Sequence, residues 1–177
     1  AVLARQMFAE LASDEAGPAG INRFELRITS QNGEDGILLY LLTHLGAGTQ
    51  EFVEFGVSDG RECNCANLAI NFGWHGLMLE GDAASAARAD AYYRHVLHTD
   101  TPRVRVAQQW VTAENINQLM QEHASNPDIL SIDIDGMDYW VWKAITAVRP
   151  RIVIIEYNAT FGPERAVTVP YRADFDR

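Results

Sequence analysis

EFVEFGVSDGRECNCANLAINFG (residues 51–73) is the stretch that decides the fold of this chain. Its first five residues, EFVEF, combine aromatic and β-branched residues over a short run that ends at a glycine, which indicates a short β-strand. The glycine-containing turn GVSDG (residues 56–60) follows, and the residues after it have the length and composition of a helix. The stretch therefore predicts a strand, a tight turn and a helix, which together are the first half of a βαβ unit.

The alternation of strand and helix continues beyond this stretch. We expect further strands at residues 75–82, 103–110, 128–135 and 150–158, and helices at residues 83–96, 112–124 and 137–148. The expected strands are rich in Val, Ile and Leu on both faces, as in a parallel sheet that helices cover on both sides. The sequence therefore predicts a doubly wound, Rossmann-like α/β fold, with no comparably strong strand after residue 158.

The 177 residues are expected to form one domain with a sizeable core. Residues 1–50 are predicted to be an N-terminal helical segment, with one helix over residues 2–12 and another within residues 30–48. Ser30 and Asn32 are candidate N-caps of the second helix. Residues 51–177 are predicted to be the Rossmann-like, cofactor-binding domain.

The formal net charge of −10 disfavours nucleic-acid backbones and anionic membranes as partners. The sequence shows neither a signal peptide nor an apolar run of about 18 residues, so we expect a cytoplasmic protein. Cys63 and Cys65 are too few for a zinc site and too close for an unstrained disulfide, so we expect packing thiols. A homo-oligomer is left open.

GVSDG fits two unrelated chemistries. As G-x-S-x-G it matches the nucleophile elbow of α/β-hydrolases, with Ser58 as the nucleophile. That fold needs a catalytic histidine late in the chain, but the last histidine, His123, precedes the final two expected strands. The hydrolase interpretation therefore fails, and a cofactor-binding turn remains.

A cofactor-binding turn requires an acid at the end of the second strand, to hold ribose hydroxyls. Glu80 occupies that place, 20 residues after Gly60. Gly56 and Gly60 would let the backbone approach the ligand. The turn is not a dinucleotide fingerprint, because Ser58 stands where G-x-G-x-x-G has its second glycine, and the P-loop ending is absent.

Glu54 decides between the possible cofactors. Its negative charge beside the turn would repel a pyrophosphate but suits a cation, and S-adenosylmethionine (SAM) carries a sulfonium and an ammonium without any phosphate. SAM is therefore favoured over NAD. Gln109, after the third strand, is a candidate for the adenine edge, whereas Trp110 is expected in the core.

Three acids follow the fourth and fifth strands. Asp133, Asp135 and Glu156 are expected at the carboxyl edge of the sheet, where ligands bind in open α/β folds. They are candidate catalytic residues, because methylation of a hydroxyl needs a base or a Lewis acid near the oxygen. Their hard oxygen atoms suit Mg²⁺. The alternative is that Asp135 and Asp138 only cap the next helix.

Several motifs together resemble the FkbM-type class I SAM-dependent methyltransferases. They are SQNGEDGI, EFVEFGVSDGRECN, LMLEGD, WVTAENIN, LSIDIDGMDYWVW and IIEYNATFGP, and they span about residues 28–171. The resemblance implies a Rossmann-like methyltransferase fold, normally with seven strands, and methylation of an oxygen on a sugar or another small molecule. It also implies Asp135 and Glu156 as metal ligands, with Asp133 facing the donor.

Two alternatives to such an enzyme stay open. One is a binding module that holds SAM or a nucleotide without turnover, and the other is an NAD-dependent oxidoreductase or epimerase domain. Two further groups have undecided roles. Gln31, Glu34 and Asp35 either cap a helix or form a lid over the donor. Tyr139, Trp140 and Trp142 are expected in the core.

Overall fold

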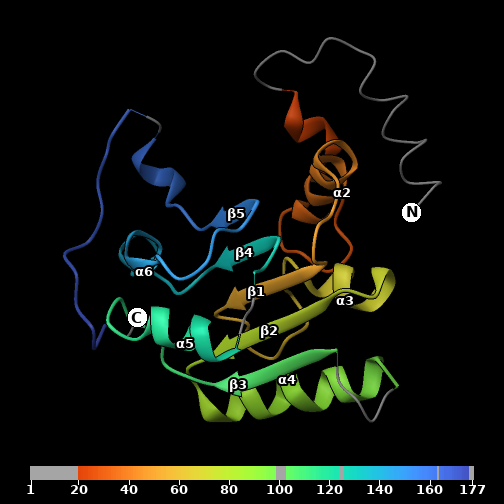
Figure 1. Ribbon diagram of the computed structural model, residues 1–177. Helices are drawn as coiled ribbons and strands as arrows, with labels where there is room; N and C mark the ends of the chain where they lie inside the picture. Colours follow the sequence, from red (N-terminus) through yellow and green to blue (C-terminus); the bar gives the residue numbers. More distant parts are fainter. Residues whose placement is uncertain (1–19, 99–102, 124–125, 163, 176–177) are drawn as a thin grey trace.

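The computed structural model describes residues 20–98, 103–123, 126–162 and 164–175, so the helix expected over residues 2–12 lies outside it. Five parallel strands form one sheet in the order β3-β2-β1-β4-β5 (Figure 1). The strands are β1 (Glu51–Phe55), β2 (His75–Glu80), β3 (Val104–Gln108), β4 (Ile129–Ile132) and β5 (Ile152–Ile155). The expected doubly wound α/β fold is confirmed.

Helices connect the strands and cover both faces of the sheet. They are the 3₁₀ helices η1 (Ile21–Phe24) and η2 (Ala159–Phe161), and the α-helices α2 (Glu34–Leu45), α3 (Ala66–Phe72), α4 (Ala83–Val96), α5 (Ile116–His123) and α6 (Asp138–Ala144). The α4 bounds are those that the sequence predicts. None of the helices in the described ranges is long and apolar enough to cross a bilayer.

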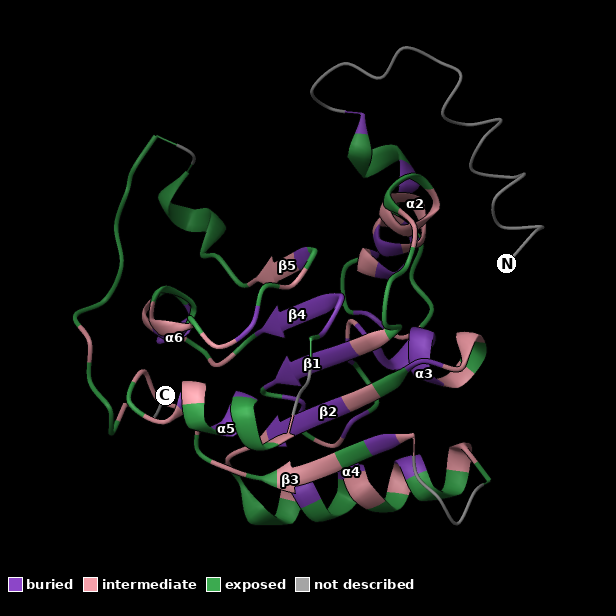
Figure 2. Ribbon diagram, viewed as in Figure 1, coloured by how far each residue is buried: buried purple, intermediate pink, exposed green. Residues whose placement is uncertain are grey.

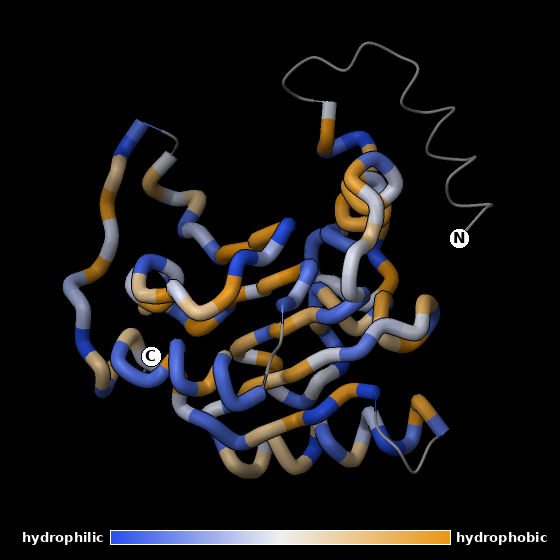
Figure 3. Tube along the Cα trace, viewed as in Figure 1, coloured by the Kyte–Doolittle hydropathy of each residue, from blue (hydrophilic) through white to orange (hydrophobic). Residues whose placement is uncertain are grey.

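Two apolar layers hold the domain together, one on each face of the sheet. Alternate strand residues such as Phe52 and Met78 pack with α2, α3 and α4, whereas Val53 and Leu79 pack with α5 and α6. The buried residues run through the central strands (Figure 2), and the hydrophobic residues follow the same strands (Figure 3). Burial on both faces explains why the strands lack a polar side.

The strand order reverses between β1 and β4. The chain passes from β1 outward through β2 to β3 and then returns to the other side of β1, where β4 and β5 lie. In open α/β sheets this reversal leaves a crevice at the carboxyl ends of the strands, and ligands bind there. The fold therefore places the candidate site beside the ends of β1 and β4.

Several elements are shorter than the sequence predicts, for local reasons. β4 ends at Ile132 rather than at residue 135, because Asp135 and Gly136 have positive φ angles of 58° and 132° and leave the extended conformation. The next helix, α6, begins at Asp138. The N-cap position of α2 is Gly33 rather than Ser30 or Asn32, but the Ser30 hydroxyl still accepts the N–H of Asp35 in the first turn, at 3.1 Å.

The expectation that the aromatic residues of α6 lie in the core is wrong for two of them. Tyr139 and Trp142 are 41% and 45% exposed, and the fully buried member of that helix is Val141. Helix α6 is shorter than predicted, and its residue that packs against the apolar residues of β1 and β4 is Val141.

Candidate functional site

A cavity of about 610 Å³ opens at the carboxyl edge of the sheet. The volume falls within the range of about 300–1,000 Å³ that is usual for small-molecule sites. Nine of the residues singled out in the sequence line it: Gln31, Gly56, Ser58, Glu80, Gln109, Trp110, Asp133, Asp135 and Glu156. The fold thus brings together residues from the ends of all five strands.

Gly56 makes the close approach between β1 and β4 possible. Its φ is +71°, and a Cβ atom there would lie 1.6 Å from the carbonyl oxygen of Asp133. Its N–H donates to the carbonyl of Leu79 at 3.0 Å, which ties the turn to β2. Gly56 therefore allows the backbone conformation that forms this part of the cavity wall.

Gly60 has a different role from the one expected. It does not line the cavity; a Cβ atom there would lie 2.9 Å from the ring of Tyr93 and 3.0 Å from Ala89. The Tyr93 hydroxyl donates to the Gly60 carbonyl at 2.8 Å. The glycine thus lets the turn pack against α4, and the proposed contact between Gly60 and a cofactor remains a prediction.

Glu80 accepts hydrogen bonds from the turn after β1 and from the turn after β2, at the floor of the cavity. One carboxylate oxygen accepts the N–H of Ser58 at 2.7 Å, and the other accepts the N–H of Asp82 at 2.9 Å. Ser58 has a φ of 49°, so its N–H can turn toward Glu80. The N–H of Gln109 donates to the Glu80 carbonyl at 2.8 Å, which extends the pairing of β2 with β3.

Glu54 lies beneath a second, smaller cavity of about 250 Å³ that shares Gly56, Ser58 and Asp133 with the larger one. Its side chain is 4% exposed. It accepts the N–H groups of Asn64 and Cys65, at 2.7 and 3.0 Å, and so holds the residues that lead into α3. Burial raises the pKa of Glu54 to about 7, although these hydrogen bonds act in the opposite direction.

The raised pKa of Glu54 predicts a pH-dependent stability. The ordinary pKa of a glutamate is 4.5, so between pH 4.5 and about 7 the folded chain binds more protons here than the unfolded chain. The contribution is fully present below pH 4.5 and is lost as the pH rises through about 7. The full shift corresponds to about 3 kcal/mol of unfolding free energy.

Urea unfolding at about pH 5 and about pH 8 measures this contribution. The difference in unfolding free energy between the two pH values is expected to shrink in Glu54→Gln, which does not titrate. Glu164→Gln, in the exposed C-terminal segment, is the matched control and should keep the wild-type difference. An unchanged difference in Glu54→Gln would contradict the assignment.

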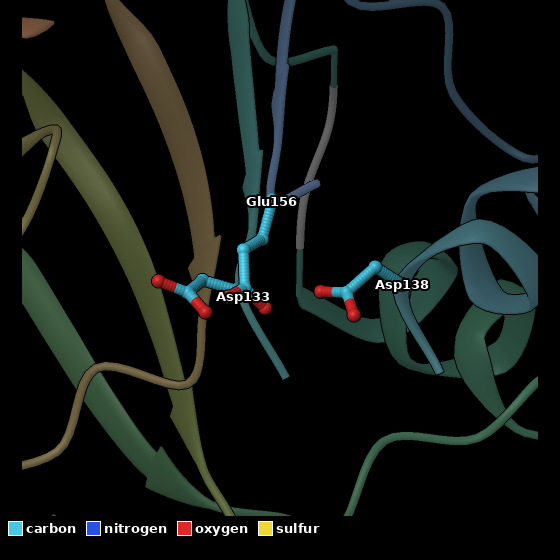
Figure 4. Close-up of side chains that lie close together, drawn as sticks. All are labelled: Asp133, Asp138 and Glu156. Atoms are coloured by element: carbon cyan, nitrogen blue, oxygen red, sulfur yellow. The ribbon is translucent and has the colours of Figure 1, made fainter. Parts of the chain in front are cut away.

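The acids after β4 and β5 form a cluster in which Asp138 takes part. One carboxylate oxygen from each of Asp133, Asp138 and Glu156 lies within 4.8 Å of the others (Figure 4). Asp135 lines the same cavity but is not a member of this group. Asp138 also accepts the N–H groups of Ile134 and Gly136, both at 2.8 Å, so it holds the turn before α6. The N-cap of α6 is Met137, and no side chain of the described residues caps this helix, so the capping alternative is wrong.

The pKa of Asp133 is raised above the ordinary value of an aspartate. Partial loss of hydration inside the cavity raises the pKa of Asp133 to about 6, and the negative charges of Glu156 and Asp138 add to the effect. A carboxylate with this pKa is ionised at neutral pH and is a stronger base than an ordinary aspartate. The cluster could therefore take a proton from a hydroxyl or hold a divalent cation.

Sequence reasoning missed the wall that the C-terminal segment builds. Tyr171, Arg172, Ala173 and Phe175 line the larger cavity, together with Trp110 and Met137. Trp110 is 46% exposed rather than in the core, because its ring lies against Gly81 and its Nε1–H donates to the carbonyl of Ala173 at 3.1 Å. The only sequence signal was the presence of aromatic residues in a segment without strand or helix periodicity.

The oxidoreductase alternative has one further sequence feature to consider. The Tyr-x-x-x-Lys spacing of short-chain dehydrogenases occurs at Tyr139 and Lys143. Neither residue lines the cavity, and the Lys143 ammonium lies 5.7 Å from the centre of the Tyr139 ring. The pair therefore does not supply a catalytic site to this cavity.

A comparison with protein families identifies the family of this chain. The family model described as the methyltransferase FkbM domain matches residues 61–175. No curated protein gives a significant match to the sequence.

Two solved structures are similar to this chain at low identity. One is an O-methyltransferase from Bacillus cereus in complex with SAH, with 19% identity, a TM-score of 0.44, and coverage of 81% of this chain and 60% of that one. The other is the O-methyltransferase TomG from Streptomyces achromogenes, involved in tomaymycin synthesis and in complex with SAM, with 18% identity, a TM-score of 0.43, and coverage of 78% and 66%. The chain thus spans less than two thirds of the length of either protein.

Proposed function

The chain belongs to the FkbM methyltransferase domain family, and from this membership we propose that it is a SAM-dependent methyltransferase acting on a hydroxyl oxygen of a sugar or another small molecule. The observation that carries the proposal is the cavity at the carboxyl edge of the sheet. Its floor has Glu80 beside the β1 turn, and its far end has the acids after β4 and β5. In this proposal one cavity would hold both the nucleoside of the donor and the acceptor hydroxyl.

The residues of the cavity suit SAM better than a dinucleotide. Glu80 would accept the ribose hydroxyls, Gln109 and Trp110 would contact the adenine, and the turn at Gly56 and Ser58 would lie under the rest of the donor. Acids outnumber basic residues on the cavity walls, to which the described part of the chain contributes a single basic residue, Arg172, so a pyrophosphate would meet mostly negative charge. When bound, SAM supplies a methyl group on a positively charged sulfur.

The acids would prepare the acceptor hydroxyl. Asp133 would take up the hydroxyl proton, and its neighbour Glu156 would help to hold the acceptor oxygen. Mg²⁺ is a hard cation that binds carboxylate oxygens, and it would lower the pKa of a bound hydroxyl. We propose Asp135 and Glu156 as its ligands, and Asp133 and Asp138 as the further carboxylates within reach of Glu156.

Replacing Glu80 by Ala is expected to weaken SAM binding by about 1–3 kcal/mol, the usual cost of losing a hydrogen-bonding partner that carries charge. Part of this loss would come from freeing the N–H groups of Ser58 and Asp82. Titration calorimetry measures it, with Glu122→Ala on α5 as the matched control. Equal SAM affinity in Glu80→Ala and Glu122→Ala would disprove a ribose-binding role for Glu80.

Transfer of a labelled methyl group from SAM tests the proposed function directly. The purified protein is incubated with sugars and small hydroxylated compounds, with Mg²⁺ and with EDTA. Transfer that EDTA abolishes and Mg²⁺ restores supports the metal-assisted form, and transfer that resists EDTA supports a carboxylate base alone. SAM binding without transfer to any acceptor would favour the binding module, and binding of NAD in place of SAM would favour the oxidoreductase.

A further inference from the structure

The motif SQNGEDG (residues 30–36) has no role in the site as described so far. The two glycines of the motif, Gly33 and Gly36, allow η1 to pack closely against the start of α2. A Cβ atom at Gly36 would lie 2.0 Å from the carbonyl oxygen of Phe24. Gly33 has a φ of +102°, and its carbonyl accepts the N–H of Leu26 at 3.1 Å. Residues 24–36 therefore form a compact turn with a fixed shape.

Asp35 is at the centre of this turn. It is 1% exposed, and its Oδ2 accepts the N–H groups of Ile28, Thr29 and Ser30 at 2.8, 2.8 and 2.7 Å. The Ser30 hydroxyl also donates to Oδ2 at 2.8 Å. Its other oxygen, Oδ1, lies 3.0 Å from the Thr29 hydroxyl, so both oxygens have partners within the turn. Asp35 therefore fixes the backbone just before Gln31 and is not a lid.

Thr29 joins this turn to the segment after β1. Its hydroxyl accepts the N–H of Asn67 in α3 at 3.0 Å and lies 3.2 Å from the carbonyl oxygen of Cys63. An exposed ion pair between Arg27 and Glu62, at 2.7 Å, connects the same two segments. The position of residue 31 relative to the β1 turn is thus set by hydrogen bonds on both sides.

Gln31 is the residue that this framework presents to the cavities. It lines both the larger and the smaller one, and its side chain is exposed. The amide makes no hydrogen bond to the described residues, whereas the amide of Asn64 in the same smaller cavity donates to Ser131 at 3.0 Å. A polar side chain on a fixed backbone, without a hydrogen-bond partner among the described residues, is available to a ligand.

The chemistry of the smaller cavity indicates which part of the donor reaches it. Its walls carry the carboxylates of Glu34, Glu54, Asp59, Glu62 and Asp133. Asp59 and Glu62 are ion-paired with Arg61 and Arg27, so Glu34, Glu54 and Asp133 are the acids left to attract an ammonium group. A carboxylate beside that ammonium would need an N–H donor among these acids. The Gln31 amide has two such hydrogens and can bind a carboxylate.

We propose that Gln31 binds the amino-acid end of the methyl donor where the two cavities meet, and that Asp35 and Thr29 are its positioning residues. This inference rests on the proposed function, because it takes SAM as the donor. It assigns SQNGEDG to the ligand site, with Gln31 as the contact and the rest of the motif as its support.

Two ligands that differ only at the amino-acid end test the proposal by calorimetry. S-adenosylhomocysteine has this end, and 5′-methylthioadenosine lacks it. Gln31→Ala is expected to weaken S-adenosylhomocysteine binding about ten-fold and to leave 5′-methylthioadenosine binding unchanged. An equal loss for both ligands, or no loss for either, would overturn the proposal while wild-type binding still supports the SAM site. Wild-type protein that binds neither ligand would overturn the proposed function as well.

The positioning role is tested at Thr29, where the fold is less at risk than at buried Asp35. Thr29→Val is expected to show the same selective loss as Gln31→Ala, and Thr29→Ser, which keeps the hydroxyl, is expected to restore binding. Thr43→Val is the matched control, because the Thr43 hydroxyl only donates to the Leu39 carbonyl within α2, at 2.7 Å. A purely structural role would instead lower the affinity for both ligands equally, and thermal unfolding reports any general loss of stability.

Discussion

Replacing Asp133 by Asn is expected to lower kcat for methyl transfer by about 10²–10⁴-fold, the usual contribution of a general base. The amide keeps the shape of the side chain but cannot accept the hydroxyl proton. SAM affinity should change far less, because the ribose and adenine contacts of the cavity remain. The measurement is the rate of labelled methyl transfer under saturating substrate, with Asp90→Asn on α4, which does not line the cavity, as a control of the same chemical change.

The pH dependence of the wild-type rate checks the same assignment independently. The pKa of Asp133 is raised to about 6, and the base must be ionised to act. The rate should therefore be constant above about pH 7 and fall about ten-fold per pH unit well below pH 6. Near-wild-type kcat in Asp133→Asn, or a rate that stays constant down to about pH 4, would show that another group accepts the proton.

Replacing Gly56 by Ala is expected to lower the free energy of unfolding by about 3–5 kcal/mol. The left-handed φ of +71° costs a side chain about 1–2 kcal/mol. The added Cβ would also lie 1.6 Å from the Asp133 carbonyl oxygen. The backbone fixes the position of the Cβ, and the carbonyl oxygen is itself a backbone atom. No change of rotamer therefore relieves this contact, and β1 must move away from β4.

Gly46→Ala separates the two contributions. Gly46 also has a φ of +71°, but nothing lies within 4 Å of the position that its Cβ would take. Urea unfolding should show only the conformational cost in this control, about 1–2 kcal/mol. Equal losses in the two variants would mean that the approach of β1 to β4 is looser than the structure shows.

The sheet could be predicted from the sequence because each strand has its own local signal. Apolar runs such as EFVEF and IVII are bounded by glycine, proline or charged residues, and α4 was predicted to the residue. Strand and helix ends were less predictable, since long-range contacts set them. The start of α3 at Ala66 depends on Glu54, which holds the N–H groups of Asn64 and Cys65.

The candidate site could be predicted in part. Glu80 and the acids after β4 and β5 follow from the rule that ligands bind at the carboxyl edge of the strands. The roles of Gly60 and Asp138 did not follow, because they depend on Tyr93 of α4 and on the turn after β4. The wall at Tyr171–Phe175 had no periodicity to reveal it, and a tertiary contact with Trp110 places it.

The reversal of strand order also dictates when the site can exist during synthesis. Glu54 of β1 and Ser131 of β4 are 77 residues apart in the chain and 3.4 Å apart in the fold. When β1, β2 and β3 of a nascent chain have left the ribosome, only one side of the crevice can form. The other side forms after β4 has been synthesised. Pairing over such a separation closes late and slowly. The growing polypeptide therefore passes through a stage at which three strands are made, an apolar edge of β1 is uncovered and the donor cannot yet bind to protect it.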